Sequence, residues 1–467
     1  MRRALLLVCL ALCGCAGLQG LSPRATPADP ASFSAEKTLQ GHTGGDWPRE
    51  DWWKRYGDAQ LDRLIGEALA SSPTTRIAQA RVDRAIAAAQ ASGAARAPQV
   101  DASADMTRQR YSANGFFPPP IAGSTYTQTQ LAASLNWDLD LFGRNRARYE
   151  SAVGAARAAE VDAFAARLVL STGIARLYFQ LARSFEQLDL ARKSLEEREM
   201  LQRLTAQRVG AGLDSRLELK QVETSIPAAR RRIVQLDEEI AVARAQLAAL
   251  AGKGPDRGLE IARPAPQPAA VGVPTSVPAD LLGRRPDVVA QRWRVESSRR
   301  AIDAAKAEFY PDVNLAALIG VQSITLSRLL DAGSAIPSLG AAVRLPLFDG
   351  GRLRGNLAAR DADYDLAVEQ YNQTLADALR EVVEQLAALR SVHAQRAEVE
   401  SALGAAEEAY QIAVDRYHAR VGNYLQVIAA EQPVLEQRVA RADLQARELD
   451  VSVALVRALG GGMEPAQ

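Results

Sequence analysis

The sequence predicts a duplicated α+β fold that is mainly α-helical and carries two pairs of β-strands. Two stretches, Gly143–Arg208 and Gly351–Tyr417, each run for about 66 residues without a proline. They are rich in Ala, Leu, Arg, Glu and Gln, which lose little side-chain freedom in a helix. As single helices they would each be about 100 Å long, which is several times the usual length. Before each stretch the apolar residues alternate with polar ones, which is typical of strands.

Landmarks of the first half recur in the same order in the second half. Pro73 and Pro98 bound a helical run, and Pro286 and Pro311 bound another, 213 positions later at both ends. Arg208 matches Arg416, with an offset of 208. Further matches join Leu141-Phe142-Gly143 to Leu347-Phe348-Asp349 and Leu217-Glu218-Leu219 to Leu425-Gln426-Val427. This register predicts an ancient duplication.

Residues 1–14 are predicted to be a signal peptide. Arg2 and Arg3 precede an apolar run that is too short to span a bilayer as a permanent helix. The run ends in Leu12-Cys13-Gly14-Cys15, which resembles the bacterial lipoprotein signal. That resemblance implies cleavage before Cys15 and a lipid on its thiol and amino group; an ordinary leader with chance cysteines is the alternative. All three cysteines lie here, so the mature chain cannot form an internal disulfide.

Residues 15–50 read as an extended, lipid-anchored strap, and residues 51–255 as the first repeat. The repeat begins with Trp52-Trp53 and short helices, one of them amphipathic. A β-hairpin over 99–141 follows, with alternation such as Val100, Ala102, Ala104 and Met106 on one face. The long helix 143–208 carries two opposed apolar stripes, which indicates a neighbour on each side, as in a helical wall. A turn then leads to a return helix over 215–251.

The second repeat is predicted at 281–460, after a Pro-rich connector at 256–280. It contains a helix over 287–310, a hairpin over 312–348, the long helix 351–417 and a return helix over 423–459. The long helix has a heptad seam that includes Val368, Leu375, Val382 and Leu389. Residues 461–467 follow a run of glycines and are predicted to be a disordered tail.

The predicted strands are long enough to cross an outer membrane. Each has about 10 to 14 residues, and a tilted transmembrane strand needs about 9 to 11. Four strands do not close a barrel, because about eight are needed, and open sheet edges are not tolerated in lipid. The subunit is therefore expected to share a barrel with copies of itself. Two hairpins on a soluble sheet are the alternative, which leaves the long helices and the lipoprotein signal unexplained.

Composition argues against several other classes. Removing Arg2 and Arg3 from 56 basic residues leaves 54 against 55 acidic ones, so no basic excess indicates nucleic acid. The three histidines, His42, His393 and His418, are scattered and predict no metal site. The sequence shows no clustered His/Asp/Ser set and no phosphate loop, so no catalytic residues are expected.

Several motifs together resemble the TolC-type outer-membrane efflux proteins, and within them the lipoprotein branch (OprM-like, NodT-like). The Arg-Arg-Pro-Asp sequence at Arg284–Asp287 is quite specific for that branch, and the resemblance extends from Trp52 to Leu459. The other matching stretches are Trp52-Trp53 with Leu61 and Leu64-Ile65, Ala307-Glu308-Phe309-Tyr310-Pro311, and Leu345-Pro346-Leu347-Phe348-Asp349-Gly350-Gly351-Arg352.

The resemblance implies a homotrimer with a 12-stranded β-barrel that continues into a long periplasmic α-helical barrel. It implies a protein that spans the outer membrane, is anchored there by lipid, and has a large periplasmic part. The expected function is a passive exit duct for drugs or small solutes, fed by a proton-driven inner-membrane pump through a periplasmic adaptor. No cofactor is expected apart from the lipid on Cys15. Two alternatives stay open: a duct for polypeptide (type I-like) secretion, and a periplasmic coiled-coil scaffold without a pore.

The same resemblance implies that the two helical turns meet the adaptor and close the pore. Arg420 stands where relatives commonly have glycine, and the positions where relatives often place an acid hold Gly422, Gln426 and Ala429. A mostly uncharged constriction at Tyr424 and Gln426 is therefore expected; simple helix packing by these two is the alternative. The adaptor-facing residues are expected to be Arg208, Gly212, Leu213 and Leu217 at the first turn and Arg416, Val421, Gly422 and Leu425 at the second.

Overall fold

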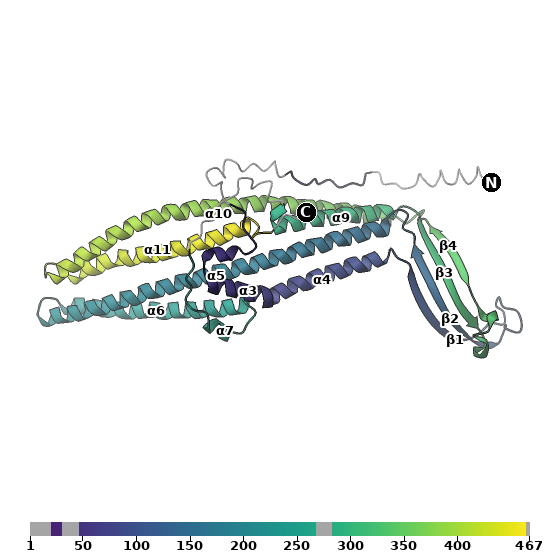
Figure 1. The fold of residues 1–467 in the computed structure, drawn as a ribbon, viewed down its shortest axis with the longest axis horizontal. Helices are drawn as coiled ribbons and strands as arrows, with labels where there is room; N and C mark the ends of the chain where they lie inside the picture. Colours follow the sequence, from purple (N-terminus) through teal and green to yellow (C-terminus); the bar gives the residue numbers. More distant parts are fainter. Residues whose placement is uncertain (1–19, 30–45, 268–282, 464–467) are drawn as a thin grey trace. The chain divides into compact units, whose positions relative to one another are not determined.

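The computed structural model describes residues 20–29, 46–267 and 283–463 (Figure 1). The described residues divide into two compact units: residues 20–27, 81–159 and 290–372 form the first, and residues 28–29, 46–80, 160–267, 283–289 and 373–463 form the second. The signal peptide 1–14 and the lipidation site Cys15 lie outside the described residues. Among the helices that the structure describes, none combines the length and the apolar character needed to cross a membrane.

The first unit contains one antiparallel sheet, in the order β1-β2-β3-β4. Its strands are β1 (Gln99–Arg110), β2 (Thr125–Asp138), β3 (Asp312–Ser323) and β4 (Ser338–Arg344). The two hairpins join through β2 and β3, whose register runs from Thr129 opposite Ser323 to Asp138 opposite Asn314. The strands β1 and β4 are therefore the two edges of the sheet.

The last strand is shorter than the sequence analysis expected. The hairpin was predicted to reach residue 348, but β4 has 7 residues and ends at Arg344. Pro346 explains the early end, because proline has no N–H to donate to a strand ladder. Leu347 and Phe348 lie beyond the strand and are exposed.

The helices of the first repeat are α4 (Pro73–Ala94), α5 (Arg144–Gly210) and α6 (Arg216–Leu250). Those of the second repeat are α9 (Pro286–Ala307), α10 (Arg352–His418) and α11 (Tyr424–Ala458). Both short helices begin at a proline, whose fixed φ suits the first helical position. Arg230 on α6 pairs with Glu199 on α5 at 2.8 Å, and Arg438 on α11 pairs with Glu407 on α10 at 2.9 Å. Each residue of the second pair lies 208 positions after its counterpart, so the duplication extends to side-chain contacts.

The core of the second unit lies where α5, α6 and α11 meet two short elements, η2 (Trp52–Tyr56) and α3 (Ala59–Ser71). Tyr56 is fully buried and its hydroxyl lies 2.6 Å from that of Ser452. Tyr178 is also fully buried and donates a hydrogen bond of 2.7 Å to Asp58. These pairings satisfy polar atoms that would otherwise be costly to bury. The apolar face of α3 packs here, as its amphipathic pattern predicts; its members are Leu61, Leu64, Ile65 and Ala68.

Arg285, from the Arg-Arg-Pro-Asp motif, ties three helices of the second unit together. Its Nε and Nη2 atoms donate to both carboxylate oxygens of Asp287, at 2.9 and 2.6 Å. Its Nη1 atom donates to the carbonyl groups of Ala378 on α10 and Ala458 on α11, each at 3.3 Å, and lies 3.0 Å from Glu381. A buried guanidinium is tolerated only with such a complete set of acceptors.

Parts of the segments expected to be irregular are packed. The glycines after α11 form a turn with φ of 91°, 62° and 89° at Gly460, Gly461 and Gly462. A Cβ on Gly461 would lie 2.1 Å from the side chain of Leu168. The prediction of a disordered tail is therefore wrong for residues 461–463, and residues 464–467 lie outside the described part. In the connector, Asp256–Leu259 form the helix α7 and Ile261 is buried.

In the first unit, α5 and α9 approach closely at Gly154. A Cβ at this position would lie 3.1 Å from the Cβ of Ser297, whose hydroxyl donates to the Ser151 carbonyl at 2.8 Å. We expect Gly154→Leu to destabilise the protein by about 1–3 kcal/mol, because the helices would have to separate. Gly355→Leu on α10 is the control, since a Cβ there meets nothing within 4 Å. Thermal unfolding followed by circular dichroism tests this, and equal melting temperatures for the two variants would contradict the close packing.

Candidate functional site at the helical turns

The turn between α5 and α6 is closed by a left-handed residue. Gly212 has a φ of +70°, its N–H donates to the Val209 carbonyl at 3.1 Å, and the N–H of Leu213 donates to the Arg208 carbonyl at 2.8 Å. Glycine adopts this conformation without steric cost. Ser215 then caps α6: its side chain accepts from the N–H of Leu217 at 3.2 Å.

The turn between α10 and α11 repeats this geometry 208 positions later. The N–H of Arg420 donates to the Tyr417 carbonyl at 3.2 Å, and the N–H of Val421 donates to the Arg416 carbonyl at 3.0 Å. Asn423 caps α11 by accepting from the N–H of Gln426 at 3.0 Å. The left-handed position is occupied by Arg420, with a φ of +67°. A residue with a Cβ costs about 1–2 kcal/mol more than glycine in this conformation.

A polar network of buried and half-buried side chains joins the first turn to the end of α10. The guanidinium of Arg208 donates to both carboxylate oxygens of Asp214, from Nε at 2.8 Å and from Nη2 at 3.0 Å. The Tyr417 hydroxyl donates to the same carboxylate at 2.8 Å and lies 3.1 Å from the Thr205 hydroxyl. Arg208 also donates to the Tyr417 carbonyl at 3.1 Å, and its guanidinium lies 4.3 Å from the centre of the tyrosine ring. We call Thr205, Arg208, Asp214 and Tyr417 the turn network.

The turn network holds its carboxylate in the charged form. Hydrogen bonds from Arg208 lower the pKa of Asp214, burial opposes this shift, and the Tyr417 hydroxyl adds to the lowering. Burial raises the pKa of the Tyr417 hydroxyl, so it remains a hydrogen-bond donor at neutral pH. The result is a bidentate ion pair, the geometry in which Arg and a carboxylate bind most strongly.

A small apolar cluster adjoins the turn network through Tyr417. Its buried members are Tyr417, Tyr424, Leu201, Val222 and Val427. Tyr424 is 1% exposed and its ring centre lies 6.3 Å from that of Tyr417. Burial raises the pKa of Tyr424 to about 12. Its side chain therefore packs inside this chain, whereas Gln426, its partner in the predicted constriction, is exposed.

The structure brings the predicted adaptor-facing residues together in two corresponding sets. Leu213 and Leu217 at the first turn and Val421 and Leu425 at the second are between 47% and 68% exposed. Gly422 donates its N–H to the Arg416 carbonyl at 3.0 Å, so it belongs to the turn itself. Arg208 is different from these residues, because its guanidinium is turned inward to Asp214. The sequence analysis did not predict that Thr205, Asp214 and Tyr417 form a network with Arg208. The available signal was an acidic residue, Asp214, six positions after Arg208 on the other side of the turn.

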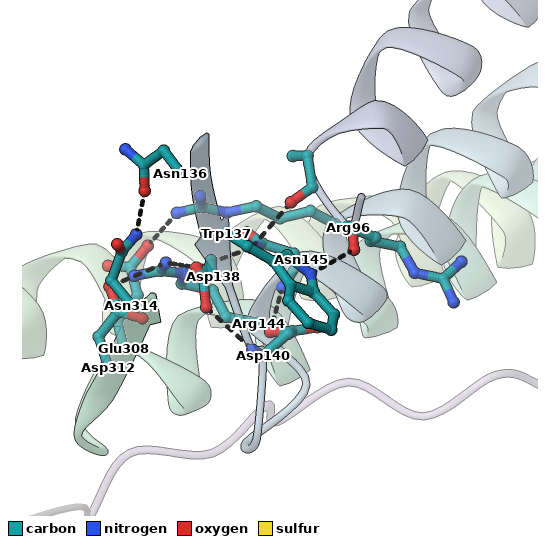
Figure 2. A network of polar contacts seen from close by, with 12 residues as sticks. Arg96, Asn136, Trp137, Asp138, Asp140, Arg144, Asn145, Glu308, Asp312 and Asn314 are labelled. Carbon is teal, nitrogen blue, oxygen red and sulfur yellow. Dashed lines mark hydrogen bonds and ion pairs between the residues drawn. The ribbon is translucent and has the colours of Figure 1, made fainter. Parts of the chain in front are cut away.

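A second polar network lies in the first unit, where strands meet helices (Figure 2). Arg144, the first residue of α5, pairs with Asp138 at the end of β2 and with Asp312 at the start of β3, the latter at 3.1 Å. Asn145 donates to Asp138 at 2.8 Å, and Asp140 caps α5 by accepting from the N–H groups of Asn145 and Arg146, each at 2.8 Å. This network fixes the direction in which α5 leaves the sheet. In the described ranges no group of three or more His, Cys, Asp or Glu residues is arranged to hold a metal ion.

The strained position at the second turn generates one prediction. We expect Arg420→Gly to stabilise that turn by about 1 kcal/mol, because it removes the Cβ clash of a left-handed residue. Gly212→Ala should destabilise the first turn by a similar amount. Hydrogen exchange of peptides that contain each turn, measured by mass spectrometry, reports both changes. Faster exchange in Arg420→Gly would show that the side chain stabilises the turn despite its conformation.

The turn network generates a second prediction, on acid sensitivity. The pKa of Asp214 is lowered in the folded state, so its stabilising contribution is present above the unfolded pKa of about 3.9 and is lost as pH falls through the folded value. We expect protection of both turns from exchange, corrected for the intrinsic pH dependence, to decrease below about pH 4. Asp214→Asn should cost about 1.5 kcal/mol at neutral pH, the lower range for hydrogen bonds to a charged group, and remove this acid dependence. An unchanged acid dependence in the variant would assign it to other groups.

Comparisons with known proteins agree on one family. Residues 64–253 and 277–461 match the family model described as outer membrane efflux protein. The fusaric acid resistance protein FusA of Burkholderia cepacia is 38% identical over 77% of this chain and 69% of its own length. The multidrug resistance outer membrane protein MdtP of Escherichia coli K12 is 32% identical over 90% of this chain and 87% of its own length.

The fold agrees with the same family. The crystal structure of the outer membrane protein VceC from Vibrio cholerae superimposes with a TM-score of 0.84 at 36% identity, covering 89% of this chain and all of VceC. The mainly α-helical fold with a small antiparallel sheet, predicted from the sequence, is thereby confirmed, as is the resemblance to TolC-type proteins. The protein lies in the outer membrane and has a large periplasmic part. Its family consists of channels rather than enzymes. The chain belongs to the outer membrane efflux protein family.

Proposed function

We propose that this chain is the outer-membrane component of a tripartite efflux system. It would act as a passive exit duct for drugs or small solutes that an inner-membrane, proton-driven pump delivers through a periplasmic adaptor. The observation that carries the proposal is the family match over both repeats. The names of FusA and MdtP concern resistance to small molecules, which favours this substrate class over polypeptides.

The sheet supports the proposal that three copies assemble. The residues of β1 and β4 are exposed along both strands, and each strand has a partner on one side only. An edge strand in lipid would leave backbone N–H and C=O groups without partners, which costs several kcal/mol for each group. Pairing of β1 with β4 of the next copy removes both edges, and three copies of four strands give the proposed 12-stranded barrel.

The strap supports a proposed lipid anchor on Cys15. Within the first unit, the backbone N–H groups of Arg24 and Ala25 both donate to Asp365 on α10, at 2.8 and 2.9 Å. The chain that follows the predicted lipidation site by about ten residues is therefore bound to the protein surface. A lipid joined to the thiol and to the amino group of Cys15 would add a membrane attachment independent of the strands.

The turns are proposed to close the duct and to meet the adaptor. The turn network joins α5 and the first turn to α10, so separating the turns requires that the half-buried Arg208–Asp214 pair and its tyrosine partner come apart. Gln426 supplies an exposed polar side chain for an uncharged constriction. Tyr424 packs inside the chain and holds the start of α11, on which Gln426 lies. The exposed aliphatic residues of both turns supply the proposed adaptor surface: Leu213, Leu217, Val421 and Leu425.

One experiment tests the proposed system as a whole. The gene would be deleted in its host and restored on a plasmid, and accumulation of a panel of amphiphilic dyes and antibiotics would be compared. Cross-linking in intact cells, followed by purification and mass spectrometry, would identify the bound proteins. We expect a trimer with an adaptor and a proton-driven pump. A transporter ATPase together with a secreted polypeptide would replace this proposal by secretion, and a complex without any inner-membrane protein would overturn it.

The proposed closure generates a prediction on leak. Asp214→Asn should raise passive entry of a large antibiotic such as vancomycin about tenfold, because about 1.4 kcal/mol lost from the closed state shifts the open population by that factor. Gln426→Ala should raise it less, through loss of one polar side chain. Lys220→Gln, on the exposed side of α6, is the control. Equal entry in all three strains, at equal protein levels, would exclude the turn network from closure.

A further inference from the structure

The two turns share one backbone but differ in their charges. At the first turn, Arg208 is neutralised by Asp214. The corresponding residues of the second turn, 208 positions later, are Arg416 and Gly422, so the arginine is kept while its carboxylate partner is replaced by glycine. The second turn has thus lost the internal counter-ion that the first turn retains.

The second turn carries another cation, Arg420, at a backbone position where a side chain is energetically costly. Where the first turn has Gly212, the second has Arg420, in the left-handed conformation that any residue with a Cβ adopts at a cost. Residues held in such conformations cluster at functional sites, where the surrounding structure maintains them. Over the described ranges, neither Arg416 nor Arg420 has a carboxylate within ion-pair distance, and both are exposed. Asp415, their nearest acidic neighbour in the sequence, accepts from Gln411 at 2.9 Å.

No carboxylate in the described part of this chain therefore balances the two charges. A partner can do so, since an Arg–carboxylate pair at the edge of an interface steers association and selects against the wrong partner. The neighbouring side chains suit such a contact. Val421 and Leu425 are exposed next to the two arginines and offer an apolar area that excludes water around the pair.

We propose that Arg420, together with Arg416, is the specificity-determining cation of the second turn, and that it binds an Asp or Glu side chain of the periplasmic adaptor. The first turn, whose arginine is satisfied internally, makes apolar contacts through Leu213 and Leu217. One protein thus presents two chemically different docking surfaces on one duplicated backbone. This inference rests on the proposed function, because it requires that an adaptor meets the turns.

The test moves the charge without changing the composition. A photo-cross-linking amino acid would be placed at Ala419, an exposed residue of the second turn, in the full-length protein expressed in its own host lacking the chromosomal gene. Cross-linked adaptor would be quantified in the parent and in Arg420→Gly, Arg420→Lys and the double variant Gly212→Arg/Arg420→Gly. The double variant keeps the net charge and the number of strained arginines, but carries the cation on the first turn.

We expect Arg420→Gly and the double variant each to lower the cross-link yield about fivefold, the upper range for an exposed charge pair, and to reduce its dependence on salt. Arg420→Lys should keep most of the yield. Full yield in the double variant would show that net charge alone matters and would overturn the inference. If the parent neither exports dyes nor cross-links to an adaptor, the proposed function fails; if the parent does both and all variants match it, only this inference fails.

A genetic arm identifies the contacted residue. Arg420→Glu should abolish dye export, and suppressors that restore it would be selected and sequenced. We expect changes from Asp or Glu to Lys or Arg in the adaptor gene. Suppressors within the gene of this chain would assign Arg420 to a contact between copies, and would overturn the inference.

Discussion

An arginine can leave water only where acceptors replace the water it loses, and this constraint fixes the chain at three places. Arg144 at the start of α5 binds two strands through Asp138 and Asp312. Arg285 joins the start of α9 to α10 and α11 through a carboxylate and two carbonyl groups. Arg208 joins the first turn to α10. In each case the fork of donors reaches segments that are distant in the sequence, which a lysine, as a point charge, would satisfy less completely.

Much of the fold follows from local patterns. Proline-free stretches predicted the long helices, alternation predicted four strands, and repeated landmarks predicted the duplication. The shortened β4 could have been anticipated from Pro346, whose missing N–H ends a ladder. The glycines after α11 misled the prediction, because a run of glycine indicates either freedom or close approach, and only the neighbouring Leu168 and Arg284 decide between the two.

The site was less predictable than the fold, for a physical reason. The turn network joins Asp214 to Tyr417, which are 203 positions apart, and no local periodicity records such a contact. Likewise, Tyr424 begins α11 beside exposed residues, and only the ring of Tyr417 and the cluster beneath it show that its side chain is buried. By contrast, the positions of the turns were predicted, because a break between two helices depends on the sequence of a few adjacent residues.

The strap illustrates how a contact can leave a sequence free to change. Asp365 binds the main chain at Arg24 and Ala25 rather than either side chain. Any residue with an N–H can occupy these two positions, and only proline would remove a donor. Selection on these two hydrogen bonds therefore acts on a single aspartate of α10, while the side chains at positions 24 and 25 can change in size and charge without removing either donor.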